Sequence, residues 1–175
     1  MDKTINIKDY LPFLRKVLLF KNLTDKQIMK VIDGMQIAEI QPEKIITKEG
    51  AREDTLFILI EGEVEITKQL VIPVVAPTED RMQKSLVVLT EKQYPFFGEM
   101  TLFLDKPERS ATVKARKKCT VAMFEKIDLL NVFDNDADIG SKIYKNIAAE
   151  LVERLKKANK DILKLTTAFT LALEG

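Results

Sequence analysis

The residues with the clearest chemical potential lie in one short stretch, 97–113, which reads FGEMTLFLDKPERSATV. We expect a strand to end at Gly98, a single helical turn to follow through Leu104, and a new strand to begin at Ser110. A turn of this kind leaves backbone N–H groups without partners, and such groups can bind an anion. The spacing therefore predicts a small anion site.

Glu99 and Arg109 supply the two charges of this stretch that suit a nucleotide. A guanidinium binds phosphate through paired hydrogen bonds, and a carboxylate accepts hydrogen bonds from a sugar hydroxyl. Ten positions apart in a compact loop, the two side chains can border one cavity, with phosphate at Arg109 and ribose at Glu99. The alternative is a structural ion pair at the mouth of a barrel, with Gly98 present only for the turn.

The elements that must position these side chains are mainly strands. Between residues 35 and 125, β-branched and aromatic residues recur in the short runs MQIAEI, KIITK, TLFILI, EVEIT, SLVVL, SATVKA and CTVAMF. Short strands without a long helix between them favour an antiparallel sandwich or barrel, and Gly62 suits a tight turn. Residues 68–84, with two prolines and a charged run, are interpreted as a hairpin tip that is a surface insertion rather than a partner surface.

Helices are expected on both sides of the strands. One or two short helices fall within 7–20, interrupted by Pro12, and a capped helix is predicted over 25–33. A short helix near 127–133 leads into a long one over 138–171. We accordingly divide the chain into N-terminal helices, a strand-rich part and a C-terminal helical part, at 1–34, 35–126 and 127–175.

The long helix carries an apolar stripe whose members are alternately four and three residues apart. Its members are Tyr144, Ala148, Leu151, Leu155, Ala158, Ile162, Leu165 and Phe169. A stripe of more than three heptads is typical of a helix that faces another helix, which favours a homodimer. The alternative is that the stripe covers the sheet of its own chain, with the first turns doing the covering.

Composition excludes several function classes. The 28 Lys and Arg balance 27 Asp and Glu, so no strong field draws the chain to nucleic acid or to a membrane. Without histidine and with one cysteine, the common catalytic triads, metal sites and iron–sulfur sites are not expected. The N-terminal sequence lacks a basic region before an apolar run. We expect a cytoplasmic protein without enzymatic activity, cofactor or metal.

Other candidates are assigned structural roles. The basic run 114–118 is interpreted as a solvated connection rather than a DNA contact, and Cys119 as a buried thiol rather than a redox sensor. Glu61, Glu63 and Glu65 alternate with apolar residues, as on the wet face of a half-buried strand. None of these residues is assigned chemistry.

The 97–113 stretch resembles the phosphate-binding cassette of cyclic nucleotide-binding domains, and its GE–LF–ERSA arrangement is most similar to that of bacterial catabolite activator proteins. The run TLFILIEGEVEI is similar to the β-roll strands of the same family. The resemblance covers about 22–171 and implies an antiparallel β-roll, or jelly roll, with N-terminal helices and a long C-terminal helix.

The resemblance also implies roles for individual residues. The implied ligand-binding set is Gly98, Glu99, Met100, Arg109, Ser110 and Ala111. Arg109, Ser110 and the backbone amides after Gly98 would hold the cyclic phosphate, and Glu99 would hold the ribose 2′-hydroxyl. Counting along the long helix places the expected base contacts near Arg154 and Leu155.

This sequence departs from the family pattern in three places. Tyr94-Pro95 replaces the usual glycine-acid pair before the cassette, Arg154 and Leu155 replace small hydroxyl residues, and no helix-turn-helix follows the long helix. The resemblance thus implies a sensor of cyclic AMP or cyclic GMP that signals through its C-terminal helix to a dimer or a separate effector. The alternative is a dimerising scaffold that has kept the β-roll and lost the ligand.

Overall fold

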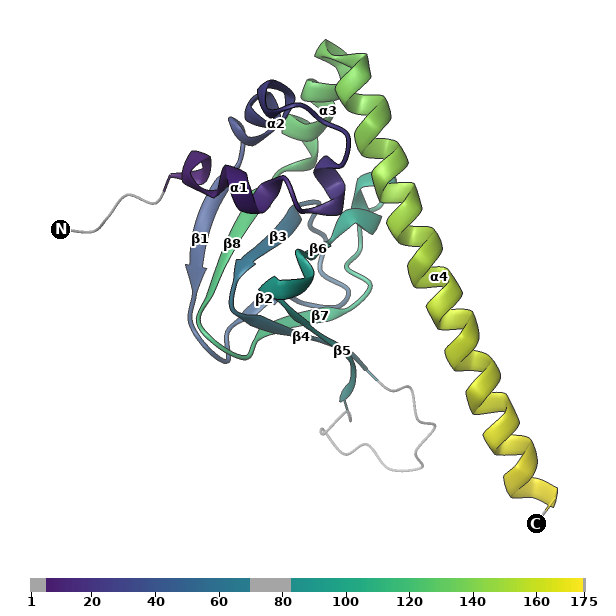
Figure 1. Ribbon diagram of the computed structural model, residues 1–175. Helices are drawn as coiled ribbons and strands as arrows, with labels where there is room; N and C mark the ends of the chain where they lie inside the picture. The colour runs from purple at the N-terminus through teal and green to yellow at the C-terminus, as the bar shows by residue number, and fades with distance from the viewer. Residues whose placement is uncertain (1–5, 70–82, 175) are drawn as a thin grey trace.

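The computed structural model describes residues 6–69 and 83–174, and its core is a pair of four-stranded antiparallel sheets. The strands are β1 (Gln36–Ile40), β2 (Ile45–Thr47), β3 (Leu56–Glu61), β4 (Glu63–Gln69), β5 (Gln83–Thr90), β6 (Phe96–Phe97), β7 (Thr112–Ala115) and β8 (Cys119–Phe124). One sheet has the order β1-β8-β3-β6 and the other β2-β7-β4-β5. The predicted β-roll with helices at both ends of the chain is confirmed (Figure 1).

Alternation along β3 explains why its apolar run is buried on both faces. Leu56, Ile58 and Ile60 pack in the cluster that includes the helices. Phe57 and Leu59 point into the other cluster, between the two sheets. Because successive side chains of a strand point to opposite faces, the single run TLFILI joins the two halves of the core.

The N-terminal segment forms short helices at one end of the roll. They are η1 (Ile7–Tyr10), α1 (Leu11–Leu14), η2 (Leu18–Phe20) and α2 (Asp25–Ile32). Pro12 was predicted to interrupt a helix, but it lies in the first turn of α1. A residue in the first turn has no backbone hydrogen-bond partner within the helix for its N–H, so the missing N–H of proline costs nothing there. The predicted capping box of Thr24 and Gln27 is present, and α2 ends at Ile32.

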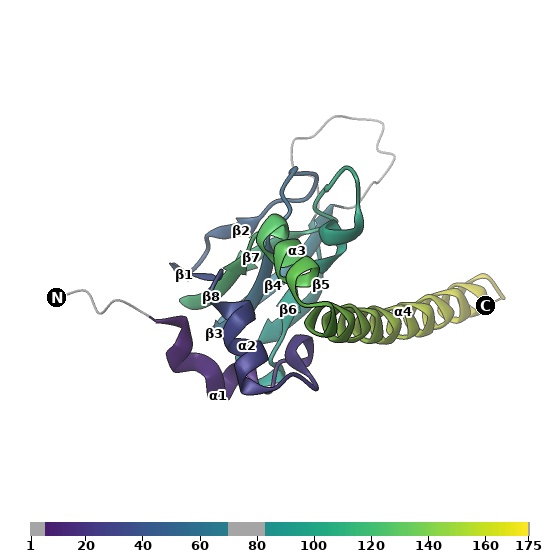
Figure 2. The same ribbon diagram turned by 90° about the horizontal axis from the view of Figure 1, so that it is seen from above.

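Helices α3 (Lys126–Asn135) and α4 (Ala137–Glu174) follow the last strand. Helix α4 is anchored only over its first half, where Ile139, Ile143 and Ile147 are fully buried. Asn146, also buried, donates hydrogen bonds to the carbonyl oxygens of Leu19 and Lys21 at 2.9 and 2.8 Å. Figures 1 and 2 show α4 continuing past the roll.

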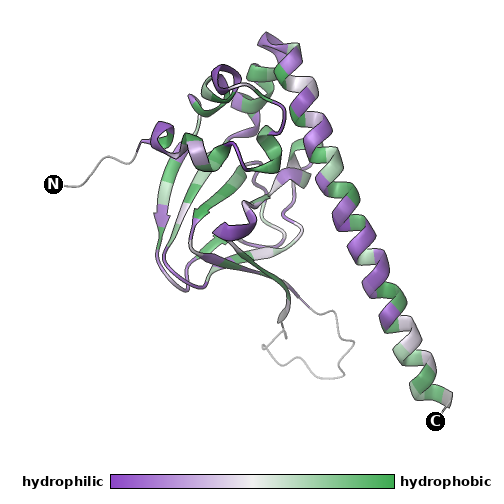
Figure 3. Ribbon diagram, viewed as in Figure 1, coloured by the Kyte–Doolittle hydropathy of each residue, from purple (hydrophilic) through white to green (hydrophobic). Residues whose placement is uncertain are grey.

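The outer half of α4 is exposed. In Figure 3, apolar and polar segments alternate along it, and the apolar ones are not covered by the roll. No helix in the described ranges is both long and apolar enough to cross a membrane.

Two details near the cassette differ from the prediction. The strand after it begins at Thr112 rather than at Ser110, because Arg109 and Ser110 still belong to the loop. The predicted hairpin tip at 68–84 falls largely outside the described residues; β4 reaches Gln69 and β5 begins at Gln83.

Candidate functional site

The turn that opens the cassette depends on Gly98. Strand β6 ends at Phe97, and Gly98 has a left-handed backbone with φ of +85° before the 3-10 helix η4 (Glu99–Phe103). A Cβ atom on Gly98 would lie 2.7 Å from Nη1 of Arg109 and 2.8 Å from the Thr55 carbonyl oxygen. The absence of a side chain therefore allows Arg109 to lie against the turn.

Arg109 is buried, with 4% of its surface exposed, and is held from two sides. Its Nη1 donates to the carbonyl oxygen of Thr55 at 2.8 Å, and its Nε donates to the Glu53 carboxylate at 3.3 Å. The guanidinium lies over the Phe57 ring, 5.3 Å from its centroid. Its Nη2 is buried without a hydrogen-bond partner in the described structure. The Nη2 group of Arg109 can therefore donate a hydrogen bond to a molecule that enters the site.

Glu99 is buried as deeply, with 1% of its surface exposed. Its Oε1 accepts a hydrogen bond from Nη1 of Arg154 at 2.9 Å, whereas its Oε2 is buried and, among the described residues, unpaired. Burial raises the pKa of the Glu99 carboxyl above its usual value of 4.5, and the charge of Arg154 opposes that shift. Glu99 therefore has a buried acceptor atom without a donor among the described residues, and leaving a buried polar atom unpaired costs free energy.

Both unsatisfied side chains line the same cavity, of about 260 Å³. Arg109, Ser110 and Ala111 line it from the end of the cassette, and Gly98 and Glu99 from its start. The alternative of a Glu99–Arg109 ion pair does not hold, because the carboxylate pairs with Arg154 and the guanidinium with Glu53. Three cationic side chains, Lys68, Arg109 and Arg154, and one carboxylate, Glu99, thus line the cavity, and a sugar phosphate offers groups that pair with both charges.

The other predicted ligand residues are distributed unevenly. Met100 and Ser110 line the cavity, are exposed, and approach each other with Ser110 Oγ 3.7 Å from Met100 Sδ. Arg154 reaches the cavity from α4 but is engaged with Glu99, Glu150 and the Phe96 carbonyl oxygen. Leu155, expected to contact a base, is 60% exposed and does not line the cavity.

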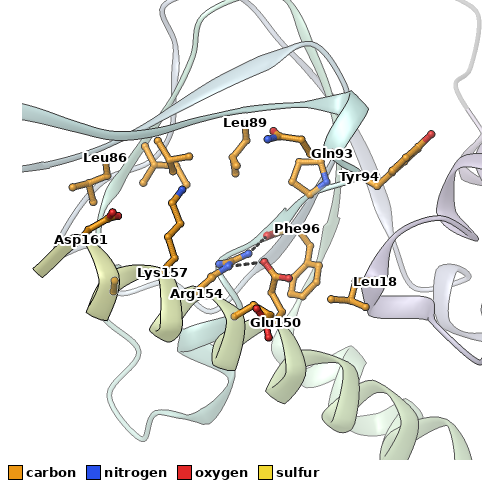
Figure 4. A pocket seen from close by; sticks show the side chains of 15 residues that line it. Leu18, Leu86, Leu89, Gln93, Tyr94, Phe96, Glu150, Arg154, Lys157 and Asp161 are labelled. Carbon is orange, nitrogen blue, oxygen red and sulfur yellow. Dashed lines mark hydrogen bonds and ion pairs between the residues drawn. The ribbon is translucent and has the colours of Figure 1, made fainter. Parts of the chain in front are cut away.

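A larger cavity of about 610 Å³ adjoins the first, between β5 and α4 (Figure 4). The two cavities have Ile66, Leu86 and Arg154 in common. Its remaining walls are mostly apolar on the side of the roll, and charged on the side of α4. The long helix therefore lines both neighbouring cavities, the cassette cavity through Arg154 and the larger one through residues on both sides of Arg154.

The residues that hold Arg109 were not predicted from the sequence. Glu53 accepts from both Arg109 Nε and Thr47 Oγ1, and the Thr55 carbonyl oxygen accepts from Arg109 Nη1. These partners lie 56 and 54 positions before Arg109. A backbone carbonyl leaves no mark in the sequence, and the only signal for Glu53 is an acidic residue just before a buried strand.

The residues that were predicted to have structural roles are buried, ion-paired or hydrogen-bonded within the protein. Cys119 is buried, and burial raises the pKa of its thiol. In the basic run, every cation is ion-paired: Lys114 with Glu43, Arg116 and Lys117 with Glu63, and Lys118 with Glu39. Glu61 accepts a hydrogen bond from Thr120 at 3.3 Å.

A β-roll that encloses a buried, incompletely paired guanidinium and carboxylate around one cavity has the architecture of a module with a site for a small polar molecule. Comparison with known families gives the particular one. Residues 37–136 match the family described as Cyclic nucleotide-binding domain. Because this match covers more than half of the chain, the chain belongs to that family.

Relatives by sequence include a protein kinase and a regulatory subunit of another protein kinase. The chain is 33% identical over 119 residues to cGMP-dependent protein kinase 2 of Homo sapiens, a match that covers 67% of this chain and 14% of the kinase. It is 32% identical to the cAMP-dependent protein kinase regulatory subunit of Yarrowia lipolytica, covering 65% of this chain and 27% of that protein. The chain thus corresponds to less than a third of the length of these relatives.

Solved structures support the fold. The catabolite activator protein of Thermus thermophilus superposes with a TM-score of 0.70 at 23% identity, over 85% of this chain and 63% of that one. A cyclic nucleotide-binding domain from Methylobacillus flagellatus has a TM-score of 0.73 at 19% identity, over 89% of this chain and 84% of that one. At these identities the likeness concerns the fold.

Proposed function

We propose that this chain is a sensor that binds cyclic AMP or cyclic GMP in the cassette cavity and transmits binding through α4. The observation that carries the proposal is the pair of buried atoms without partners, Arg109 Nη2 and Glu99 Oε2, on one 260 Å³ cavity. The cyclic phosphate accepts from Arg109 and from amides of the turn after Gly98, and the ribose 2′-hydroxyl donates to Glu99. A ligand of this kind satisfies both atoms at once.

Calorimetric titration with cyclic AMP and with cyclic GMP tests this function. Arg109→Ala should weaken binding by about 10-fold or more, since a hydrogen bond to a charged group contributes about 1.5–3 kcal/mol. Arg109→Lys keeps the charge but not the fork of donors, so it should fall between the wild type and the alanine variant. Arg116→Ala, which removes an arginine on the surface outside the cavity, is the control.

Folding of each variant is checked by its thermal unfolding curve before titration. Ligand at 100 times its Kd should add about 2.7 kcal/mol to the stability of the wild type. Equal affinity in the wild type and in a folded Arg109→Ala variant would contradict the assignment. The absence of any shift at millimolar nucleotide would instead favour the dimerising scaffold.

The route of the signal begins at Arg154. This side chain joins α4 to the cassette, because it donates to Glu99 at 2.9 Å and to Glu150 of its own helix at 2.8 Å. A ribose bound at Glu99 Oε2 adds to the network that holds α4 against the cassette. Nucleotide and helix position are then coupled, since a ligand shifts an equilibrium only by its different affinity for the two states.

The output proposed for α4 is a homodimer or a surface for a separate effector. Leu155, Ile162, Leu165 and Phe169 of the predicted stripe are each at least 60% exposed, whereas Leu151 packs against the core of its own chain. Contiguous exposed apolar residues mark interaction surfaces. The first turns of α4 therefore cover the roll, and the later turns are available to a partner.

A further inference from the structure

The larger cavity lies where the base of a bound nucleotide would extend. In a cyclic nucleotide the phosphate, ribose and base follow one another, and the proposed function places the first two at Arg109 and Glu99. Beyond Glu99 the cassette cavity is bordered by Ile66, Leu86 and Arg154, which also line the larger cavity. The base would therefore point across this border toward α4.

Two oppositely charged side chains line that part of α4. Lys157 and Asp161 are four residues apart, so they lie on one face of the helix, separated by just over one turn, or about 6 Å along its axis. Figure 4 shows Lys157 extending from α4 toward the roll, one turn beyond Arg154.

The charges of Lys157 and Asp161 are mostly not used in ion pairs within the described structure. Among the described residues Lys157 makes no ion pair, and Asp161 has only an exposed contact of 3.7 Å with Lys164. The neighbouring carboxylates of the same cavity, on Glu150 and Glu153, are instead paired along the helix. Lys157 and Asp161 are thus the charged groups on this wall that remain available to a ligand.

The two purines differ in how their polar groups are arranged. Guanine presents two adjacent acceptors, O6 and N7, and two adjacent donors, the N1 hydrogen and the 2-amino group. Adenine presents a single amino donor between the acceptors N1 and N7. A cation at this edge is attracted by an acceptor but repelled by the neighbouring amino group, and a carboxylate is attracted by the amino group but repelled by the neighbouring acceptor. A cation and a carboxylate one helical turn apart match guanine, because the cation can face the two acceptors while the carboxylate faces the two donors.

We propose that Lys157 and Asp161 select guanine, so that this chain binds cyclic GMP in preference to cyclic AMP. Lys157 donates to O6 and N7, and Asp161 accepts from the N1 hydrogen and the 2-amino group. The apolar side of the cavity, which includes Leu86, Leu89 and Phe96, receives the faces of the ring. This inference rests on the proposed binding of a cyclic nucleotide at the cassette.

Titration of the full chain with both nucleotides tests the preference. A good paired contact to a base edge discriminates by about 5- to 150-fold. The wild type should therefore bind cyclic GMP at least about 5-fold more tightly than cyclic AMP. Lys157→Met and Asp161→Ala should each remove most of this difference by weakening cyclic GMP, with little change for cyclic AMP. Both residues are exposed on α4, so these substitutions leave the core intact.

Lys156→Met is the matched control, because Lys156 is the adjacent lysine, pairs with Glu153 and does not line the cavity. It should leave the preference unchanged. Cyclic IMP, which keeps O6 and N7 but lacks the 2-amino group, separates the two contacts. Lys157→Met should weaken cyclic IMP as much as cyclic GMP, and Asp161→Ala should weaken it less.

The outcomes separate this inference from the function on which it rests. Equal affinity for the two nucleotides, a preference for cyclic AMP, or an equal loss of both in Lys157→Met would overturn the guanine preference while the sensor function stands. If neither nucleotide binds the wild type, the sensor function itself is wrong.

Discussion

The cassette and the outer half of α4 differ in the kind of group that each leaves unsatisfied. At the cassette, Glu99 and Arg109 are charged and almost fully buried, and each has an atom without a partner in the described structure. On α4, Leu165 and Phe169 are apolar and more than 60% exposed. Unpaired buried polar atoms are stabilised when a small polar ligand pairs with them, and exposed apolar side chains are stabilised when another protein surface covers them. We therefore propose different partners for the two regions, and substitutions can test each one separately.

The largest effect is expected at Gly98. Gly98→Ala puts a Cβ atom against Nη1 of Arg109 and the Thr55 carbonyl oxygen in a backbone conformation that favours glycine. Nucleotide affinity should fall by about 100-fold or more, and the free energy of unfolding by about 1–3 kcal/mol. Titration and urea unfolding measure the two effects.

Gly50→Ala is the control for the Gly98 variant. Gly50 has a similar φ of +78°, but no atom beyond its two chain neighbours lies within 4 Å of its Cβ position. A similar loss of nucleotide affinity in both glycine variants would show that crowding of Arg109 is not the cause. The cassette would then not depend on the close approach of Arg109 to Gly98.

Leu165→Glu addresses the other region. A carboxylate in the apolar stripe should weaken self-association by about 2 kcal/mol or more, or about 30-fold, because it cannot be buried against a second helix without cost. Sedimentation equilibrium measures the change, and nucleotide affinity should stay within about two-fold. Lys160→Glu changes the charge of the same helix away from the stripe. If it dissociates the protein as strongly as Leu165→Glu does, the stripe is not the interface.

Glu53→Gln refines the description of the cassette. The substitution removes the charge that faces Arg109 Nε, so the guanidinium is held less firmly and nucleotide affinity should fall by about 5-fold. Glu108→Gln, at a surface pair with Arg52, should have no effect. Unchanged affinity in Glu53→Gln would mean that the negative charge of Glu53 is not needed to position Arg109.

The smallest effect concerns pH. Because the pKa of Glu99 is raised in the folded protein, its contribution to the stability of the ligand-free chain is fully present below its usual value of 4.5 and is lost as the pH rises through the folded pKa. Urea unfolding from pH 4 upward should show this decline in the wild type and a flatter dependence in Glu99→Gln. Parallel curves would indicate that Arg154 fully compensates the buried charge.

The sequence predicts what is local and leaves open what depends on topology. The turn after Gly98 and the shared cavity of Glu99 and Arg109 follow from spacing within one loop. The Glu53 contact does not, because only the pairing of distant strands brings it to Arg109. Arg154 and Leu155 show the limit of counting along a helix: neighbouring positions point about 100° apart, so only one of them reaches the cavity. The strand after the cassette begins at Thr112 because Arg109 and Ser110 lie in the loop that lines the cavity.

Asn146 ties two parts of the chain that are far apart in sequence. Its amide donates to the carbonyl oxygens of Leu19 and Lys21, so any tilt of the first half of α4 that keeps these hydrogen bonds carries the N-terminal helices with it. If α4 moves as proposed, the part of the chain that moves includes the N-terminal helices as well as α4. A fluorophore on the surface of α2, far from both the cassette and the apolar stripe, would report the same displacement as one on α4.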